Sequence, residues 1–268
     1  MIAVTAAVFA LSVQIADAAS SDWQLNEGGR MRLIALSPDD QGRIRAALQI
    51  EPKPGWVTYW REPGDSGIPP QITLAADSGT TLDKISYPVP KPIAIGPIQE
   101  IGYDEPVTLP LDLKVAGDAK PAKLDLTAFI GLCKDICIPF QASFSLPLSS
   151  AAQSEPEEVA VLDATAATLP KPPSPDFSVE SHSLSADGKK LSLKMTLPEA
   201  AGDAPQIYVT GPSGYVFFKR MNDKRDGRDF QTDIMIGRLP KTYDIKGKRW
   251  DILAIDGDRA IETTLAFD

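Results

Sequence analysis

Two cysteines are the residues of this sequence with the clearest chemical potential. Cys133 and Cys137 are the only cysteines in the chain, and three residues separate them. A thiol pair this close can form a disulfide that opens and closes in exchange with other thiols, and so carries electrons. The same pair could instead form a permanent disulfide, and two thiolates could also bind a soft ion such as Cu(I).

The segments on either side of the cysteines have the pattern of two β-strands. Apolar residues alternate with polar ones before the pair, from Leu124 to Ile130, and after it, from Phe140 to Leu146. Such alternation around a short break marked by Gly131 is typical of a β-hairpin. The sequence therefore predicts that both sulfurs lie together at one end of a hairpin.

The short loop between the cysteines bears on the choice between a structural and a redox disulfide. Closing so short a loop stabilises a fold by only about 2 kcal/mol, against more than about 4 for a long loop. Short-loop disulfides also tend to be strained and easier to reduce. Spacing and predicted export alone nevertheless leave the redox pair and the static disulfide evenly supported.

A metal site has weaker support in the sequence. Two cysteines supply half of a zinc site, and the single histidine, His182, lies in the other half of the chain. Copper bound by the two thiolates alone remains an alternative. We therefore predict no resident metal and no organic cofactor.

Several side chains could tune or shield the two thiols. Lys134 and Asp135 lie between the cysteines, and four further candidates lie in a segment that we expect to be a loop, Gly96 to Glu105. In that loop, Glu100 and Asp104 could shift the thiol pKa, whereas Ile101 and Tyr103 could cover the sulfurs as a flap. Ordinary loop and core packing would explain these residues equally well.

The overall composition is that of a globular β-protein. The chain has 268 residues, of which 43% are hydrophobic and 24% charged, with a net charge of −9. This acidic balance, without a basic block, argues against nucleic acid and anionic membrane surfaces as partners. The 24 prolines, 19 glycines and short alternating runs predict an all-β fold of two immunoglobulin-like β-sandwich domains in tandem.

The sequence divides into four segments. Residues 1–19 are apolar and end in an A-x-A type site, which predicts a secretory signal peptide and export, although no Lys or Arg precedes the apolar run. Residues 20–149 form the first predicted sandwich and carry the cysteines. Residues 150–176 are rich in Ala and Pro and predict a linker with a short helix around Val159, Leu162 and Ala166. Residues 177–268 form a second, smaller sandwich.

Three motifs of the first domain resemble a known family. They are Gly55–Pro70, with the sequence GWVTYWREPGDSGIPP, Ile101–Leu111, with IGYDEPVTLPL, and Cys133–Pro139, with CKDICIP. This region resembles the N-terminal periplasmic domain of the thiol:disulfide interchange protein DsbD and, more closely, that of its relative ScsB. The resemblance is specific from about Trp23 to Leu148. In the ScsB group a second immunoglobulin-like domain follows, which suits the C-terminal half.

The resemblance implies a function and a role for each cysteine. It implies a periplasmic protein that takes electrons from a membrane-embedded donor of the DsbD or CcdA type, by way of a thioredoxin-like protein. The acceptor would be a periplasmic disulfide isomerase or a similar protein. Cys137 would be the nucleophile, Cys133 its resolving partner, and Glu100 to Asp104 the flap, with Ile101 or Tyr103 over the disulfide.

Two departures from the DsbD pattern shape this expectation. The cysteines are closer in sequence, and neither transmembrane helices nor a C-terminal thioredoxin-like domain is predicted, so the membrane conduit would be a separate chain. We assign the motif from Trp56 to Pro70 mainly to structure, as a strand and a rigid loop that brace the hairpin. The sequence thus predicts a thiol–disulfide oxidoreductase; the alternative is a periplasmic adaptor or copper-handling module with a structural disulfide.

Overall fold

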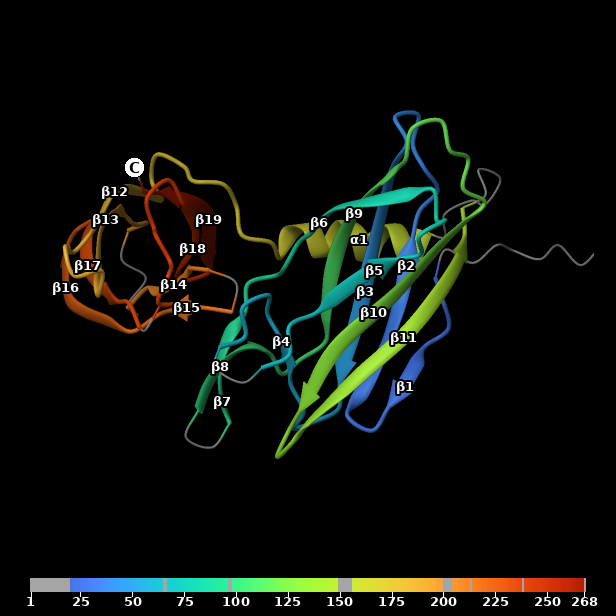
Figure 1. The fold of residues 1–268 in the computed structure, drawn as a ribbon, viewed down its shortest axis with the longest axis horizontal. Helices are drawn as coiled ribbons and strands as arrows, with labels where there is room; N and C mark the ends of the chain where they lie inside the picture. The colour runs from blue at the N-terminus through green and yellow to red at the C-terminus, as the bar shows by residue number, and fades with distance from the viewer. Residues whose placement is uncertain are drawn as a thin grey trace, which may run out of the picture.

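The chain folds into two β-domains joined by a segment with one α-helix (Figure 1). The computed structural model describes residues 20–64, 67–95, 98–148, 156–199, 204–212, 214–237 and 239–267. Each domain has two antiparallel sheets packed face to face with a core between them, and the first domain has a small third sheet in addition. This confirms the predicted all-β class with two sandwiches in tandem. The predicted signal peptide lies outside the described residues.

The first domain packs a five-stranded sheet against a three-stranded one. The larger sheet has the order β1 (Gln24–Asn26), β2 (Gly29–Ala35), β3 (Arg43–Pro52), β9 (Val107–Val115) and β6 (Thr80–Ile85). The smaller has the order β11 (Cys137–Pro147), β10 (Lys123–Cys133) and β5 (Gln71–Leu74). Alternate residues of β9 and β10 point inward, as the period of two requires, so their leucines fill the core.

A small third sheet lies at the end of this domain that faces the second domain. Its order is β4 (Thr58–Tyr59), β8 (Ile98–Tyr103) and β7 (Lys91–Ile95). The expectation of a loop from Gly96 to Glu105 is therefore wrong, because most of this segment is strand β8. The sequence of β8, IQEIGY, hides the period that marks a strand, because Glu100 and Gly102 leave the apolar residues without a regular alternation.

The second domain is a sandwich of two four-stranded sheets. One has the order β12 (Ser178–Leu184), β13 (Lys190–Thr196), β17 (Asp229–Met235) and β16 (Arg220–Asp226). The other has the order β15 (Val216–Phe217), β14 (Gln206–Thr210), β18 (Arg249–Asp256) and β19 (Arg259–Ala266). Phe177 and Trp250 are among the largest side chains buried between them.

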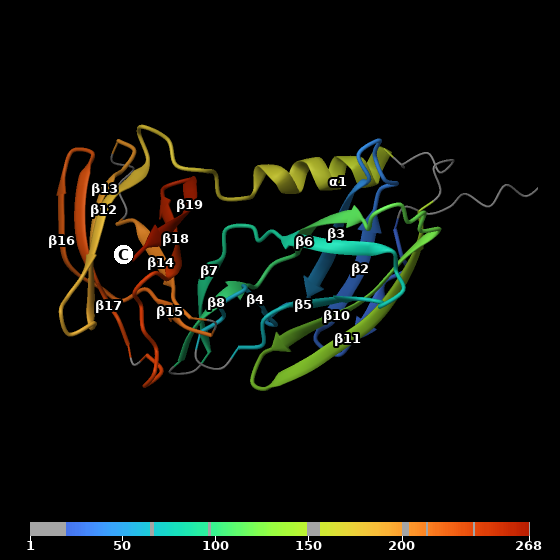
Figure 2. The ribbon, with the colours of Figure 1, turned by 45° about the horizontal axis from the view of Figure 1, so that its top comes forward.

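The connecting segment is attached to both domains. Helix α1 (Pro156–Ala167) includes the three residues whose spacing predicted a helix, and it lies along the first domain (Figure 2), where Leu162 packs on Ile34 and Ala47. The following extended chain pairs with β19, since the Lys171 amide donates to the Ala260 carbonyl at 2.9 Å. Among the described residues, no helix is long and apolar enough to cross a membrane.

Candidate redox site

The two cysteines form a disulfide at the end of the β10–β11 hairpin. The antiparallel register of these strands runs from Lys123 opposite Pro147 to Cys133 opposite Cys137. This register brings the two Cα atoms to 4.1 Å, and the sulfurs are bonded at 2.03 Å. The turn beyond them is closed by a hydrogen bond from the Lys134 amide to the Ile136 carbonyl, at 3.1 Å. The predicted hairpin, with both sulfurs at one end, is confirmed.

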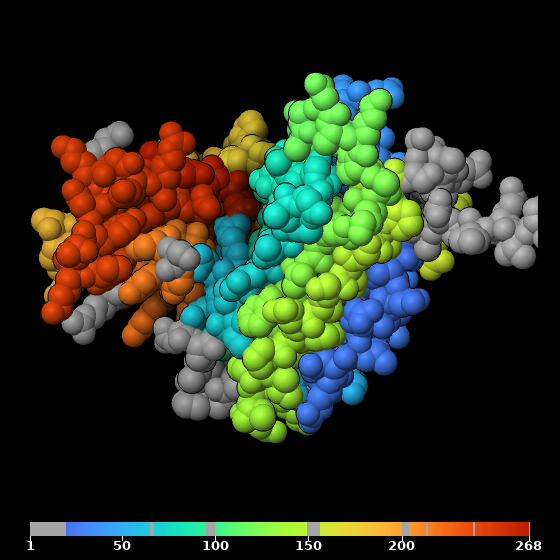
Figure 3. Space-filling model, turned by 45° about the vertical axis from the view of Figure 1, so that its right-hand side comes forward, coloured from blue at the N-terminus to red at the C-terminus, as the bar shows by residue number. Residues whose placement is uncertain are grey.

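The two sulfur-bearing residues differ sharply in exposure. Cys133 is only 1% exposed, whereas Cys137 is exposed. The difference arises because Cys133 pairs on its outer side with Val57, through hydrogen bonds of 2.8 and 2.9 Å in both directions. Among the described strands, β11 pairs only with β10, so Cys137 lies on a sheet edge. The hairpin runs along the surface to the lower end of the molecule in Figure 3, where solvent reaches it.

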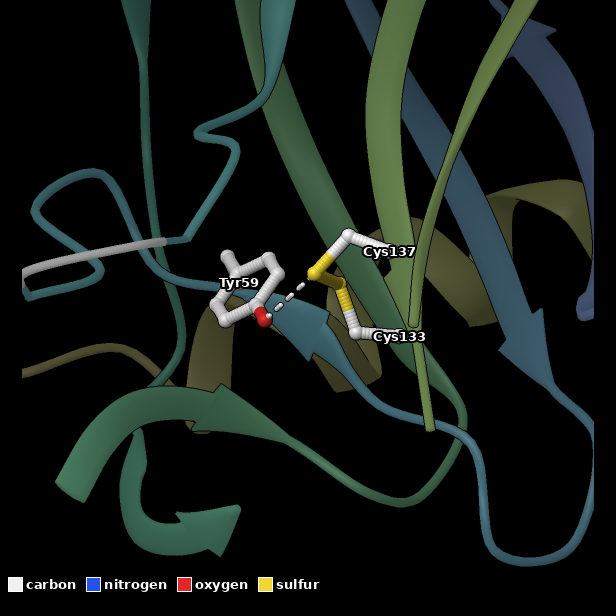
Figure 4. Close-up of a disulfide and its surroundings, with 3 residues drawn as sticks. All are labelled: Tyr59, Cys133 and Cys137. Atoms are coloured by element: carbon white, nitrogen blue, oxygen red, sulfur yellow. Dashed lines mark hydrogen bonds between the residues drawn. A yellow bond between two sulfur atoms is a disulfide. The ribbon is translucent and has the colours of Figure 1, made fainter. Parts of the chain in front are cut away.

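The Tyr59 side chain makes a polar contact with the disulfide. Its hydroxyl oxygen lies 3.4 Å from the Cys137 sulfur (Figure 4). A disulfide sulfur carries no proton, so the hydroxyl is the donor in this weak hydrogen bond. Burial, with a smaller contribution from the negative charge of Glu100, raises the pKa of Tyr59 to about 12. At neutral pH the hydroxyl therefore keeps its proton, and it can donate to a Cys137 thiolate when the disulfide opens.

Gly67 and Gly131 leave room for the Tyr59 ring, which packs closely against the backbone at both positions. A Cβ atom added to Gly67 would lie 2.8 Å from two ring carbons of Tyr59, and one added to Gly131 would lie 3.3 Å from a third. The same atom on Gly131 would come within 2.6 Å of Ile68 Cβ. The loop after β4 thus lies against both the tyrosine and the hairpin, as expected for a brace. The close approach of backbone to ring needs glycine at both positions.

The structure corrects the expected role of Ile101 and Tyr103. Both side chains are buried in the main core of the first domain, and the Tyr103 hydroxyl donates to the Pro88 carbonyl at 2.8 Å. Cys133 packs instead with Val57, Tyr59 and Ile93. The reason is strand alternation: Ile101 and Tyr103 lie on the opposite face of β8 from the residues that neighbour the disulfide. Tyr59 therefore covers the sulfurs where Ile101 or Tyr103 was expected.

The four charged candidates lie at different distances from the chemistry. Glu100 is buried, and it faces the disulfide side because it is opposite Ile93 in the β7–β8 register. Its negative charge contributes to the raised pKa of Tyr59. Asp104 is paired with Lys91, whose Nζ atom lies 2.6 Å away. Lys134 and Asp135 are exposed in the turn between the cysteines.

The surroundings bear on the metal alternative. The described residues contain no group of three or more His, Cys, Asp or Glu side chains that could hold a metal ion. His182 lies in the second domain, where its Nε2 atom is 2.7 Å from the Ala266 carbonyl oxygen. A soft metal at this site would therefore have the two sulfurs as its ligands.

Sequence reasoning placed Tyr59 in a structural motif and did not name it as a site residue. The signal was the alternation in Trp56–Trp60, which puts Val57 and Tyr59 on one face of a strand. The structure agrees, since these two side chains pack with Cys133 while Trp60 enters the core. That their face meets the disulfide depends on the pairing of Val57 with Cys133, which no local pattern shows.

Comparison with known proteins agrees with this geometry. Residues 30–149 match the family model of the N-terminal domain of the thiol:disulfide interchange protein DsbD. This part of the chain is therefore similar to the DsbD N-terminal family. The match includes both cysteines, so the pair lies in the region that is similar to a thiol:disulfide interchange protein. A comparison with curated protein sequences found no match.

The family match is confined to the first domain, whereas a solved structure resembles nearly the whole chain. That structure is the N-terminal periplasmic domain of ScsB from Proteus mirabilis, with a TM-score of 0.74. The likeness covers 93% of this chain and 98% of that one, at 21% sequence identity. At this identity it shows a shared fold, which extends through both β-sandwiches.

Proposed function

We propose that this protein relays reducing equivalents by thiol–disulfide exchange through Cys133 and Cys137. The observation that carries the proposal is the unequal exposure of the two residues within one disulfide: Cys133 is buried and Cys137 is exposed. A permanent disulfide needs no such asymmetry, whereas exchange requires that one sulfur be accessible to an attacking thiolate. The match of residues 30–149 to the family model of the DsbD N-terminal domain supports the same interpretation.

The reductive half of the relay begins at Cys137. A donor thiolate attacks the Cys137 sulfur, a new intermolecular S–S bond forms, and the bond to Cys133 breaks. Cys133 leaves with the electron pair as a thiolate and takes up a proton. The second thiol of the donor, deprotonated, then attacks the donor sulfur that is bonded to Cys137. The donor leaves with its own disulfide, and Cys137 is released as a thiolate.

The oxidative half reverses these roles. The Cys137 thiolate attacks the disulfide of an acceptor protein and forms a mixed disulfide, and one acceptor sulfur leaves as a thiolate. Cys133, deprotonated, then attacks Cys137, which restores the intramolecular disulfide and releases the reduced acceptor. Two electrons and two protons pass from donor to acceptor. The backbone pairing of Cys133 with Val57 keeps the resolving sulfur beside Cys137 throughout.

Tyr59 assists at the sulfur that changes charge. Its hydroxyl points at Cys137 and retains its proton at neutral pH, so it stabilises the Cys137 thiolate by donating a hydrogen bond. The tyrosine ring also covers part of the disulfide. Tyr59 therefore acts both as a hydrogen-bond donor and as a shield.

The proposed partners follow from the family and from the matched structure. We place the protein in the periplasm, because the ScsB structure is that of a periplasmic domain and the first 19 residues have the pattern of a signal peptide. The donor would be a membrane-embedded electron conduit of the DsbD or CcdA type, acting through a thioredoxin-like protein. The acceptor would be a periplasmic disulfide isomerase or a similar protein.

Trapping with single-cysteine variants tests the relay. We expect Cys133→Ala, in which Cys137 lacks its resolving partner, to hold periplasmic proteins as mixed disulfides that dithiothreitol releases. Cys137→Ala, which leaves only the buried thiol, should hold few or none. The trapped proteins would be identified by mass spectrometry. If neither variant holds a partner, the relay proposal fails.

The reduction potential separates the relay from the adaptor with a structural disulfide. Disulfide carriers have potentials of roughly −180 to −270 mV, whereas structural disulfides lie below about −300 mV. We expect the value of this protein in the first range, measured by equilibration with glutathione or dithiothreitol buffers. A value in the second range, together with tight Cu(I) binding by the reduced protein, would favour the copper-handling alternative.

A further inference from the structure

Arg61 forms an ionic contact between the two domains. Its guanidinium pairs with Glu262 on β19 and lies 3.9 Å from the carboxylate of Asp251 on β18. The same guanidinium stacks over the Trp60 ring, with its central carbon 4.5 Å from the ring centroid. The Arg61 and Glu262 side chains are 24% and 29% exposed, so solvent screens this pair less than a pair on the open surface. One first-domain side chain thus holds two carboxylates of the second domain.

The residues on both sides of Arg61 also contact the second domain. A Glu62 carboxylate oxygen accepts a hydrogen bond of 2.8 Å from the Gly214 amide. The Trp60 ring lies 6.2 Å, centroid to centroid, from the ring of Tyr208. Tyr208 and Leu253 are buried in the same apolar cluster as the core of the first domain. The second domain therefore contacts three consecutive residues of the first domain, Trp60, Arg61 and Glu62.

The segment that the second domain contacts, Trp60–Glu62, directly follows Tyr59. Strand β4 has only two residues, so its own ladder of hydrogen bonds is too short to fix the tyrosine. One end of β4 is fixed by the pairing of Val57 with Cys133, and the other leads into Trp60–Glu62. Tyr59 and Arg61 are about 7 Å apart along an extended chain. Figure 2 shows β4 and β8 between the cysteine hairpin and the second domain.

We infer that the second domain positions Tyr59 against Cys137, and that Arg61 is the positioning residue through which it acts. When Arg61 and Glu62 are held, the chain direction after Tyr59 is set, and the ring stays between Gly67 and Gly131 with its hydroxyl at the sulfur. When they are released, the short strand turns more freely and the hydroxyl leaves the sulfur. The inference rests on the proposed function for its choice of Cys137 as the reacting sulfur.

The pKa of the Cys137 thiol reports this positioning. Cys133→Ala leaves Cys137 as the only thiol in the chain, so the pH dependence of its alkylation by iodoacetamide can be followed by mass spectrometry. In this background we expect Arg61→Glu to raise the thiol pKa in the same direction as Tyr59→Phe, and by at least half as much. Adding Arg61→Glu to Tyr59→Phe should give no further rise.

A charge swap separates positioning from general damage. Glu262→Arg alone should raise the thiol pKa, because the new side chain would repel Arg61. Combining Arg61→Glu with Glu262→Arg restores an opposite-charge pair and should bring the thiol pKa back toward that of the parent. Arg30→Glu is the matched control, since Arg30 pairs with Glu51 on the exposed surface of the first domain at 2.7 Å. The control should leave the pKa unchanged. Glu262→Gln provides a milder variant if charge reversal prevents folding.

Two outcomes overturn the inference. The first is an unchanged Cys137 pKa in folded Arg61→Glu and Glu262→Gln proteins. The second is a shift that persists in the Tyr59→Phe background, which would show that Arg61 acts on the sulfur without the tyrosine. These readings do not depend on partner trapping, so failure of the relay proposal and failure of this inference are distinguishable.

Discussion

Two hairpins of this molecule differ in the residue pair that lies next to the turn. In the first domain, β10–β11 ends with Cys133 opposite Cys137, joined by a covalent bond on an exposed edge. In the second, β18–β19 ends with Asp256 opposite Arg259 around the turn residue Gly257, which has φ +62°. The buried carboxylate of Asp256 accepts hydrogen bonds from both terminal nitrogens of Arg225, at 3.1 and 3.3 Å.

The comparison shows what a redox hairpin needs. In the β18–β19 closure the Asp256 carboxylate is buried and paired with Arg225, so its loss affects the folded state. The cysteine closure joins two residues whose strands are already paired along their whole length, and Val57 holds Cys133 independently. Its opening can therefore change the chemistry of the chain without unfolding the sheet. Each of the following predictions tests one side of this contrast.

The largest effect is expected at the buried closure. Asp256→Ala leaves the Arg225 guanidinium without its carboxylate and should lower the free energy of unfolding of the second domain by about 2–4 kcal/mol. Reduction of the disulfide should cost the first domain no more than about 2 kcal/mol. Urea unfolding of both forms measures the two values. Asp258→Ala, at an exposed turn position, is the control; a larger loss on reduction than in Asp256→Ala would break the comparison.

The next effect concerns the brace beneath the hairpin. Gly131→Ala places a Cβ atom 2.6 Å from Ile68 Cβ, so the loop must move away. Such overpacking costs about 1–3 kcal/mol, and it should also displace Tyr59 and change the rate of disulfide reduction by dithiothreitol. Gly237→Ala is the matched control, because its added Cβ has its nearest contact at 3.8 Å. Equal stability and equal reduction rates of the two variants would show that the loop does not brace the hairpin.

A smaller effect is expected at the tyrosine. Tyr59→Phe removes a hydrogen bond to a charged sulfur and should raise the Cys137 thiol pKa by about 1 in the Cys133→Ala background. Because the pKa of Tyr59 is about 12, its hydroxyl stays protonated through the titration, and the parent should show a single transition from the thiol. Exchange at neutral pH should slow as the thiolate fraction falls. An unchanged pKa would limit Tyr59 to shielding.

The smallest effect is expected at the tip of the cysteine hairpin. Ile136 is 70% exposed and adjoins Cys137, so a protein partner would cover it during exchange. Ile136→Ser should weaken that contact by about 1 kcal/mol, or roughly fivefold in the rate of exchange with a protein. Reduction by dithiothreitol, which is too small to cover the residue, should stay unchanged. Similar slowing with both reductants would instead point to a change in the disulfide itself.

Local patterns in the sequence were enough for the elements that carry the chemistry. Alternation around the cysteines predicted the hairpin, and the spacing of Val159, Leu162 and Ala166 predicted α1. The same reading missed strand β8, because Glu100 and Gly102 break the alternation of its apolar residues. It also gave the shielding position to Ile101 and Tyr103, because alternation within one strand does not say which face meets a distant neighbour.

The sequence by itself determined that two thiols lie at one end of a hairpin in a tandem β-sandwich protein, because strand period and turn residues act over a few positions. Only the tertiary structure decided which sulfur is buried, which side chain touches the other, and how the second domain reaches the segment beside them. Val57 and Cys133, Tyr59 and Cys137, and Arg61 and Glu262 are each far apart in the chain. Their meeting depends on how whole sheets pack, a long-range outcome that no local period contains.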